Sequence, residues 1–531
     1  MVGHAPPPAA PKSPPKITPR ARTLTNWPGI IAAWGRERPD APALDDGQRQ
    51  INWGALSDQV DRIAAQLLAD GLQRGQAVAI LGTTSVAYAL AYLGAIRAGG
   101  CAAPLTTSAT PRQLANMLAD SGAIHLFIDR EKRAELTASG VDLGSARHIM
   151  LDAADGDAPA MDSWMAAAGS TPDIAPPEPG DPFNIIYSSG TTGTPKGIVH
   201  SHAMRWRQSV AGFQSIYSED ARAILSTPLY SNTTLAVFLP TMVHGGLARL
   251  MGKFDVGQWL NAAEAMRATH TMLVPVQYQR LLSDPAFDAH DLSSMQIKFC
   301  TSAPFSAELK AEALRRFPGG LVEIYGMTEG GVVCMLQAHN FPDKLHTVGQ
   351  PVKGHELKVI DENGNELPPG SKGEMVGRSP TMMSGYKNQP EKTREMEWRD
   401  ADGSLWFKMG DIGIMDEDGF VQIVGRAKDM IISGGFNIYP KDLEEVLMQQ
   451  PGVADAAVVG MPSERWGETP VGFVVAAPGY ALDLGILLSE VNAELGKTQR
   501  LSALYPIDEL PRSHIGKILK TDLRAMLAEG V

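Results

Sequence analysis

Residues 187–197 read Tyr-Ser-Ser-Gly-Thr-Thr-Gly-Thr-Pro-Lys-Gly and combine hydroxyl groups, glycines and one lysine in a short stretch. Glycines let backbone N–H groups approach an oxygen closely, hydroxyls add donors, and Lys196 adds a positive charge. This composition predicts a loop that binds phosphate. It is not a Walker A loop, because GxxxxGK[ST] would need glycine where Pro195 stands, and a GxGxxG dinucleotide motif is also absent. A glycine- and threonine-rich surface turn is the alternative interpretation of this stretch alone.

Four further motifs follow in the chain. They are Tyr-Gly-Met-Thr-Glu at 325–329, Phe-Lys-Met-Gly-Asp at 407–411, Gly-Arg-Ala-Lys-Asp at 425–429 and Leu-Pro-Arg-Ser-His-Ile-Gly-Lys-Ile-Leu-Lys at 510–520. In this order the five motifs resemble the signature of the adenylate-forming superfamily, which contains acyl-CoA synthetases, carrier-protein adenylation domains and beetle luciferases. The second of the four departs from the family's common Tyr-Arg-Thr-Gly-Asp. The chain is most similar to a stand-alone acyl- or aryl-CoA synthetase.

The resemblance implies a reaction in two steps. The carboxylate of an acid attacks the α-phosphorus of ATP and forms an acyl adenylate with release of pyrophosphate; CoA then takes the acyl group and AMP leaves. Tyr325 would pack on adenine, Thr328 would contact the α-phosphate, and Glu329 would hold Mg²⁺, a cation that prefers oxygen ligands. The residues implied to cradle the β- and γ-phosphates are Ser188, Ser189, Gly190, Thr191, Thr192, Gly193 and Lys196. The residues implied to border adenine and the acyl group are Ser302, Ala303 and Pro304.

The later motifs supply the rest of the implied site. Asp411 would accept hydrogen bonds from the ribose hydroxyls, and Arg426 would assist at the ribose or the phosphate. Lys428 occupies the hinge position about which the C-terminal domain turns between the two steps. Lys517 would bridge the acyl carboxylate and ATP in the first step, so that Lys517, Thr328 and Glu329 form the implied catalytic set. The Gly434–Gly435 pair matches the turn along which the pantetheine arm of CoA passes.

The acyl pocket is expected, by position in the family, to contain small or apolar residues. They are Tyr230, Ser231, Val276, Gln277, Thr301, Gly326, Met327, Gly331 and Val332, with Ser302 and Ala303 beside them. The segment at 228–234 has no carboxylate that could pair an α-ammonium group, which disfavours an amino acid. No unpaired arginine or lysine is evident to hold a second carboxylate. We therefore expect an apolar monocarboxylic acid, whether aromatic, arylalkanoic or a medium- to long-chain fatty acid. Ser231 stands where the family often has histidine or phenylalanine, which leaves the gating of the pocket open.

Length and composition limit the class of protein. The chain has 531 residues, enough for more than one domain, and a net charge of −12, which disfavours a general nucleic-acid or membrane-surface binder. Three cysteines without metal or disulfide spacing favour the cytoplasm. No apolar run is long enough to span a membrane. The proline-rich residues 1–24 are predicted to form a disordered tail, because prolines prevent the helix of a transit peptide.

The elements that must position the motifs follow an α/β pattern. Strands at 77–81 and 125–128 alternate with helices, one capped by Ser85 and running to Arg97, the other starting after the Thr110 cap and ending at Gly122. This alternation predicts mostly parallel sheets covered by helices. The large N-terminal domain is predicted to span 25–427.

A different pattern begins after the predicted hinge at Lys428. A short strand at 430–432 precedes a helix at 440–449 and two apolar runs at 454–459 and 471–476. This order predicts a small, mobile α+β C-terminal domain at 428–531. Because only a short segment follows Lys517, we expect a free-standing ligase rather than a synthetase module.

Other functions remain open at this point. An acyl-AMP ligase that loads a separate carrier protein is the main alternative, and CoA-dependent release of AMP would separate the two. A luciferase-like oxygenase would need a luciferin pocket, to which no residue points. A non-catalytic nucleotide-binding protein is disfavoured by the intact set of motif residues. The expected partners are the carboxylic acid, ATP and CoA, without nucleic acid; a homodimer is compatible with the sequence, which does not fix an oligomeric state.

Overall fold

The computed structural model describes residues 26–188, 196–210, 216–433, 436–496, 499–513 and 516–530. The predicted tail at 1–24 lies outside the described residues. By the density of internal contacts the chain divides into two compact units. The first comprises Met1–Ser188, Gly197–Met272 and Asp288–Lys298, and the second comprises Ser189–Lys196, Leu273–Phe287 and Phe299–Val531.

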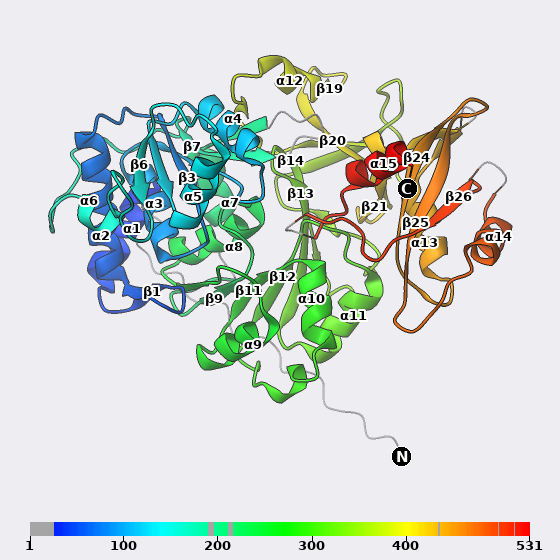
Figure 1. The fold of residues 1–531 in the computed structure, drawn as a ribbon, viewed down its shortest axis with the longest axis horizontal. Coiled ribbons are helices and arrows are strands. Elements are labelled where there is room, and N and C mark those ends of the chain that lie inside the picture. Colours follow the sequence, from blue (N-terminus) through cyan, green and yellow to red (C-terminus); the bar gives the residue numbers. More distant parts are fainter. Residues whose placement is uncertain are drawn as a thin grey trace. The chain divides into compact units, whose positions relative to one another are not determined.

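The first half of the chain alternates helices and short strands (Figure 1). Its elements are α1 (Trp27–Glu37), β1 (Pro42–Asp45), β2 (Gln50–Asn52), α2 (Trp53–Ala69), β3 (Ala77–Leu81), α3 (Val86–Arg97), β4 (Cys101–Pro104), α4 (Pro111–Ser121), β5 (His125–Ile128), α5 (Arg130–Ser139), β6 (Arg147–Met150), α6 (Met161–Trp164), β7 (Pro182–Ser188), β8 (Lys196–Ser201), α7 (His202–Val210), β9 (Arg222–Leu225), α8 (Asn232–Val243), β10 (Leu247–Leu250), α9 (Val256–Ala265) and β11 (His270–Leu273).

Two sheets organise the first unit. Within this unit, the strands of one sheet follow the order β8-β7-β4-β3-β5-β6, and those of the other follow the order β11-β9-β10-β1-β2. The pairs β3–β4, β3–β5, β5–β6, β9–β10 and β1–β10 are parallel, and the β1–β2 pair at the edge is antiparallel. Parallel neighbours need a crossover connection, which the intervening helices supply. The predicted parallel sheets covered by helices are confirmed.

Local signals fixed the ends of these helices. The Ser85 hydroxyl accepts a hydrogen bond from the Tyr88 N–H, and Thr110 forms a capping box at the start of α4. Gly122 ends α4 with a left-handed backbone, as a glycine does readily. These predictions are confirmed. The segment 152–182, which is otherwise mostly irregular, contains the short helix α6, in which Met161 and Trp164 are buried.

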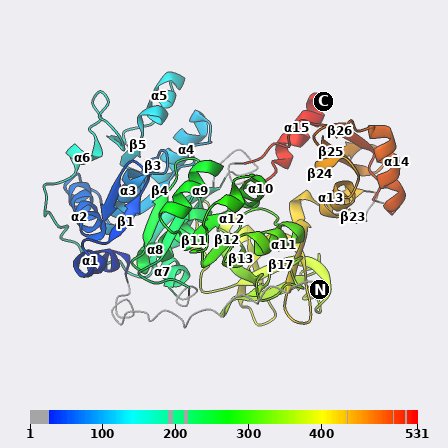
Figure 2. The same cartoon turned by 90° about the horizontal axis from the view of Figure 1, so that it is seen from below.

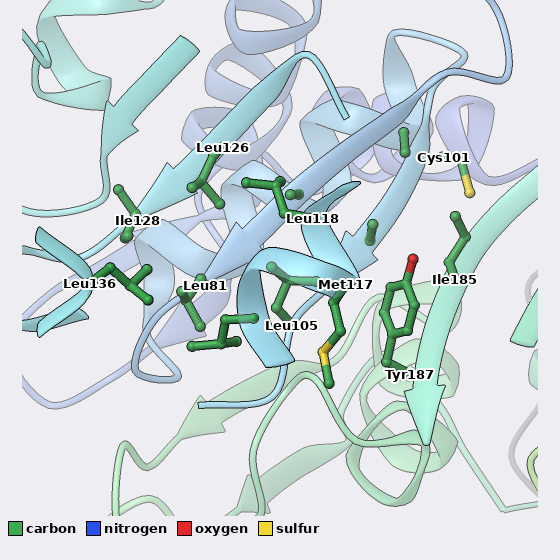
Figure 3. Close-up of a cluster of buried hydrophobic side chains, with 14 of the residues drawn as sticks. Leu81, Cys101, Leu105, Met117, Leu118, Leu126, Ile128, Leu136, Ile185 and Tyr187 are labelled. Atoms are coloured by element: carbon green, nitrogen blue, oxygen red, sulfur yellow. The ribbon is translucent and has the colours of Figure 1, made fainter. Parts of the chain in front are cut away.

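One hydrophobic core of the first unit lies against α4 and α5 (Figure 3). Alternate residues of a strand point to the same face, so Ala77, Ala79 and Leu81 of β3 all contribute to it. Met117 and Leu118 of α4 pack against them (Figure 3). Ile185 and Tyr187 of β7 belong to the same core, so the strand leading into the phosphate motif is held from its apolar side.

The second half of the chain contains more strands. Its elements are α10 (Pro275–Ser283), the 3-10 helix η1 (Phe287–Ala289), β12 (Ile297–Cys300), α11 (Ala307–Arg316), β13 (Gly320–Met327), β14 (Gly330–Gln337), β15 (Gln350–Pro351), β16 (Glu356–Ile360), β17 (Lys372–Arg378), β18 (Gly385–Tyr386), α12 (Pro390–Glu395), β19 (Glu397–Arg399), β20 (Leu405–Met415), β21 (Val421–Arg426), the 3-10 helix η2 (Ala427–Asp429), β22 (Ile431–Ser433), β23 (Phe436–Ile438), α13 (Pro440–Met448), β24 (Val453–Ser463), β25 (Gly467–Ala476), α14 (Leu484–Glu494), β26 (Ala503–Pro506) and α15 (Lys520–Glu529).

Antiparallel pairing dominates the second unit. Strands β13, β14 and β15 pair antiparallel, and β16, β17, β20 and β19 form a second antiparallel sheet to which β21 adds. Buried side chains including Val332, Met375 and Met409 form one core between these strands. The register of β20 and β21 places Asp411 opposite Arg426.

The C-terminal part of the second unit is an α+β arrangement, as predicted. Its sheet has the order β23-β22-β25-β24, with β26 parallel to β25. Figure 2 shows α13 and α14 beside these strands, and both helices contribute to one apolar core with Leu443, Leu447 and Leu487. The fold is therefore α/β, with a large N-terminal domain of sheets and helices and a smaller C-terminal domain. Among the described residues, no helix is long and apolar enough to cross a membrane.

Candidate active site

One buried carboxylate in the second unit contacts side chains from two other motifs. Asp411 of β20 is only 4% exposed, and its Oδ1 lies 2.9 Å from Nε of Arg426 at the end of β21. The hydroxyl of Tyr325, near the end of β13, donates to Asp411 Oδ2 at 2.6 Å. Burial raises the pKa of the Asp411 carboxyl, although the Arg426 cation and the Tyr325 hydroxyl both act to lower it. The structure thus brings together three of the residues that the motifs single out.

Lys517 lies in a turn before α15. The turn is closed by Ser513, whose carbonyl accepts from Gly516 N and whose N–H donates to Lys517 O, both at 2.8 Å. Gly516 has a φ of 77°, and a Cβ there would lie 3.1 Å from Cγ1 of Val276, so the turn favours glycine. The Asp411 charge reaches the Lys517 ammonium and favours its protonated form.

Positive charge dominates the surroundings of Lys517. Its pKa is lowered to about 8, first by desolvation and then by the cations of Arg426 and Lys428, while Asp411 and Asp429 act in the opposite direction. The side chain keeps solvent-accessible surface, so the desolvation reflects crowding by protein atoms rather than complete removal from water. Cations that lower one another's pKa in this way can be stabilised by binding an anion that carries several negative charges.

Lys428, the predicted hinge, lies in the 3-10 helix η2 and is exposed. Its pKa is lowered, first by desolvation, and then by Arg426, Arg524 and Lys196, while Asp429 raises it. Arg524 of α15 forms an ion pair with Asp429 at 3.0 Å. Lys428 therefore shares the cationic neighbourhood of Lys517, and its hinge role stays a prediction.

Glu329, the residue expected to hold Mg²⁺, has a partner that the sequence analysis missed. The hydroxyl of Tyr386 donates to Glu329 Oε1 at 2.7 Å. The Tyr386 ring also faces Lys196, whose Nζ lies 5.2 Å from the ring centroid. Tyr386 thus links the predicted metal ligand to the lysine of the phosphate motif. Nothing in the local sequence distinguishes Tyr386 from a core tyrosine.

The donor set at Glu329 fits Mg²⁺. Magnesium is commonly held by one or two carboxylates together with substrate phosphates, so a single protein carboxylate is sufficient. Among the described residues, no group of three or more His, Cys, Asp and Glu side chains is placed to hold a metal ion. Thr328, next to it, is partly exposed.

The segment after β12 carries an unusual backbone. Ser302 has a φ of 81°, which is uncommon for a residue with a side chain and concentrates at functional sites. The hydroxyl of Thr301 donates to the Ile324 carbonyl at 2.6 Å and fixes the segment to β13. Ala303 is partly exposed and Pro304 is exposed. The segment is thus held in place and open to solvent, as a surface for adenine would be.

Several residues predicted for the acyl pocket have structural roles of their own. The Ser231 hydroxyl accepts from Thr233 N at 3.2 Å and caps α8. Oε1 of Gln277, which is buried, accepts from Val274 N at 3.1 Å and caps α10. Val332 is fully buried in the core that contains Met375 and Met409. A pocket role for these residues stays a prediction.

The remaining pocket residues differ in exposure. Gly326 is exposed, and Met327 packs on the same core as Val332. Gly331 has a φ of 74°, and a Cβ there would lie 2.7 Å from Sδ of Met409, so only glycine fits. Tyr230 and Ser231 belong to the first unit, and the other pocket residues belong to the second.

Part of the predicted site lies outside the described residues. Strand β7 ends at Ser188 and β8 begins at Lys196, so strands flank the phosphate motif on both sides. The residues outside the described ranges are Ser189, Gly190, Thr191, Thr192, Gly193, Gly434 and Gly435.

The sequence shows no evident unpaired arginine or lysine that could hold a second carboxylate, and in the structure one arginine lacks a carboxylate partner among the described residues. Arg205 of α7 is buried and, among the described residues, hydrogen-bonds only to neutral groups. One of them is Asn232, which follows Ser231 in the chain. The sequence could not reveal this because its partners come from four separate positions.

Comparison with known proteins agrees with this site. The AMP-binding enzyme family model matches residues 31–387, and the model of the AMP-binding enzyme C-terminal domain matches residues 442–517. The chain is 35% identical over 511 residues to a feruloyl-CoA synthase from Amycolatopsis sp., with 95% of this chain and 99% of the relative covered. It is 30% identical to an indoleacetate–CoA ligase from Aromatoleum aromaticum, with 92% and 96% covered.

A solved structure supports the same conclusion. The crystal structure of ATP-bound MatB from Rhodopseudomonas palustris matches with a TM-score of 0.83 and 30% identity, covering 94% of this chain and 99% of that one. The chain belongs to the AMP-binding enzyme family. The enzyme class predicted from the motifs, an AMP-forming acid–CoA ligase, is confirmed, and the carrier-protein alternative is not favoured.

Proposed function

We propose that this acid–CoA ligase acts on aryl and arylalkanoic acids, with Mg²⁺–ATP and CoA as co-substrates. The observation that carries the proposal is the buried Asp411–Arg426 ion pair, both of whose charges act on Lys517. A carboxylate surrounded by cations fits a nucleotide, because Asp411 can accept from ribose hydroxyls while the cations face the phosphates.

In the first step Lys517 lies between the negative reactants. The acid's carboxylate oxygen attacks the α-phosphorus of ATP, and the bond to pyrophosphate breaks. Lys517 and Arg426 supply positive charge where the negative oxygens meet, which lowers the barrier electrostatically. Thr328 would contact the α-phosphate, and Tyr325, held by Asp411, would pack on adenine.

Magnesium would be held by Glu329, whose carboxylate Tyr386 orients. The ion supplies charge neutralisation for the phosphates when it is bound. Lys196, positioned over the Tyr386 ring, would face the β- and γ-phosphates together with the rest of the phosphate motif.

In the second step the sulfur of CoA attacks the carbonyl carbon of the acyl adenylate, and AMP leaves. We propose that rotation about Lys428 removes Lys517 from the site and brings Gly434 and Gly435 to the pantetheine arm. The charge of Asp411 acts on Lys517 in the described structure, which supports a role for Lys517 in the first step.

The choice of acid is supported by two relatives named as feruloyl-CoA synthase and indoleacetate–CoA ligase, both acting on acids with an aromatic ring. We place the enzyme in the cytoplasm, since Cys101, Cys300 and Cys334 are buried free thiols. A homodimer remains the proposed assembly.

ATP–pyrophosphate exchange with a panel of aryl, arylalkanoic and C6–C18 fatty acids tests the proposal, with thioester and AMP followed after CoA is added. We expect exchange with aryl acids and CoA-dependent thioester formation. Exchange restricted to fatty acids would contradict the substrate class. Exchange without CoA turnover would contradict CoA as the acceptor and return the carrier protein to consideration.

A further inference from the structure

A buried cation without an acidic partner lies next to the segment predicted for the acyl pocket. Arg205 is 2% exposed, and its Nε donates to Asn184 Oδ1 at 2.8 Å. Its Nη1 donates to Gln208 Oε1 at 3.0 Å and to Asn232 Oδ1 at 2.8 Å, and its Nη2 lies 2.8 Å from His200 Nδ1. Burial lowers the pKa of Arg205 to about 10, so it remains a cation at neutral pH.

Such an arrangement is energetically unusual. Buried charges in proteins are normally paired with an opposite charge, because removing a charge from water is costly. Arg205 has four partners among the described residues, and none is a carboxylate. The Nη2 atom has two hydrogens and one acceptor among these residues. Among the described residues, the Arg205 cation therefore has no opposite charge as a partner, and one N–H of its Nη2 atom has no acceptor.

Two tyrosines on α3 also have buried polar groups without a hydrogen-bond partner among the described residues. Tyr88 and Tyr92 are both buried and lie on one face of the helix, since they are four residues apart. Neither hydroxyl has a hydrogen-bond partner among the described residues, and the same is true of Nδ2 of Asn184. Buried polar atoms are nearly always hydrogen-bonded, so a group of orphaned ones points to a bound molecule or water.

These groups lie close to one another and to Tyr230. Burial raises the pKa of Tyr88, and the hydroxyls of Tyr92 and Tyr230 raise it further. Burial also raises the pKa of Tyr92, and the Arg205 cation acts to lower it. Electrostatic effects of this kind fall off with distance, so Tyr88 lies near Tyr92 and Tyr230, and Tyr92 lies near Arg205.

Direct contacts tie the same elements to the pocket segment. The N–H of Leu229 donates to Thr84 Oγ1, just before α3, at 2.9 Å. Three residues later, Asn232 is held by Arg205 of α7. Tyr230 lies between these two anchors in the chain, and its hydroxyl interacts electrostatically with that of Tyr88.

We propose that Arg205, Tyr88 and Tyr92 form a polar subsite that binds an oxygen acceptor carried by the acyl group, such as a hydroxyl, methoxy or carboxylate group on an aromatic ring. The donor set decides the ligand chemistry: a guanidinium only donates and a phenol can donate, so the matching group accepts. A cationic substituent would be repelled by Arg205. The inference rests on the proposed function, because Tyr230 is placed in the acyl pocket through the family.

The first test compares kcat/KM for ATP–pyrophosphate exchange with cinnamic acid and with its 4-hydroxy, 4-methoxy and 4-carboxy derivatives. We expect at least one oxygenated acid to be preferred over cinnamic acid by about tenfold or more, since unmatched buried donors discriminate strongly against an analogue that lacks the acceptor. Preference for the carboxy acid would identify the Arg205 charge as dominant, and preference for the hydroxy or methoxy acid would identify the tyrosines.

The second test uses Tyr88→Phe and Tyr92→Phe, which remove one orphaned oxygen each and no hydrogen bond within the described protein. The fold is expected to survive, with an unchanged or higher midpoint of thermal unfolding. The preference for the oxygenated acid is expected to fall about tenfold in at least one variant. The control is Tyr217→Phe, the same change at a buried tyrosine stacked on His270 at 4.3 Å, which is expected to leave the preference unchanged.

The outcomes separate the two proposals. Equal kcat/KM for all four cinnamic acids, or a preference untouched by both tyrosine variants, overturns the subsite and leaves the proposed function intact. Absence of exchange with every aryl acid overturns both.

Discussion

Replacing Lys517 with alanine removes the positive charge that the site directs at the first step. Removing one such stabilising group typically costs about 10²–10³ in rate, or roughly 3–4 kcal/mol of transition-state stabilisation. Lys517 is exposed, and the charge of the buried Asp411 acts on its ammonium group. We therefore expect acyl-adenylate formation to slow by about 10²–10³.

The pKa of Lys517 adds a pH dependence to the same prediction. With a pKa of about 8 the free enzyme holds most of this ammonium charged at pH 7, but only about a tenth remains charged one pH unit above the pKa. Thus kcat/KM for the first step should fall as pH rises through about 8. Bound phosphates favour the charged form, so kcat should fall only at higher pH.

The assay measures the half-reactions separately: ATP–pyrophosphate exchange for the first, and thioester formation from supplied acyl adenylate and CoA for the second. Lys520→Ala is the matched control, since Lys520 lies three residues on and pairs with Glu444 at 2.6 Å. Only Lys517→Ala should lose exchange, and it should keep the second half-reaction. Exchange within about threefold of wild type, against the loss expected for a charge stabiliser, would refute the role of Lys517. An equal loss in both half-reactions would indicate structural damage instead.

Three further predictions concern the groups around this charge. Tyr386→Phe removes the hydroxyl that orients Glu329. We expect the Mg²⁺ concentration for half-maximal exchange to rise about tenfold, while the unfolding temperature stays the same. An unchanged Mg²⁺ titration would contradict the orienting role. Asp411→Asn replaces the acceptor for the ribose hydroxyls and should raise KM for ATP by about a hundredfold or more; if Asp411 binds ribose, 2′-deoxy-ATP and ATP should become nearly equivalent in this variant. Gly516→Ala places a side chain in a turn where φ is 77°. The left-handed backbone costs such a residue roughly 1–2 kcal/mol, so exchange should slow by about tenfold. Thioester formation from supplied acyl adenylate should stay unchanged if the effect is confined to the position of Lys517.

Local features of the fold could be predicted because they depend on residues a few positions apart. The cap at Thr110 and the end of α4 at Gly122 follow from side-chain and backbone preferences within a single turn. The βα alternation followed from short apolar runs between caps, and it correctly predicted parallel sheets in the first unit. The acyl pocket was harder to predict, because Gln277 could line a pocket or cap α10 and its position in the sequence does not distinguish the two.

The sequence by itself determined the family and the chemistry, because five motifs in a fixed order carry the acceptors and cations that an acyl adenylate requires. Only the tertiary structure decided which of them meet. The register of β20 and β21 places Asp411 against Arg426, and the charges of both act on Lys517, which follows the turn at Gly516. The pairing of Tyr386 with Glu329 and the acid-free surroundings of Arg205 also became apparent only in the structure. Contacts between distant segments depend on strand register and packing, which local spacing along the chain does not encode.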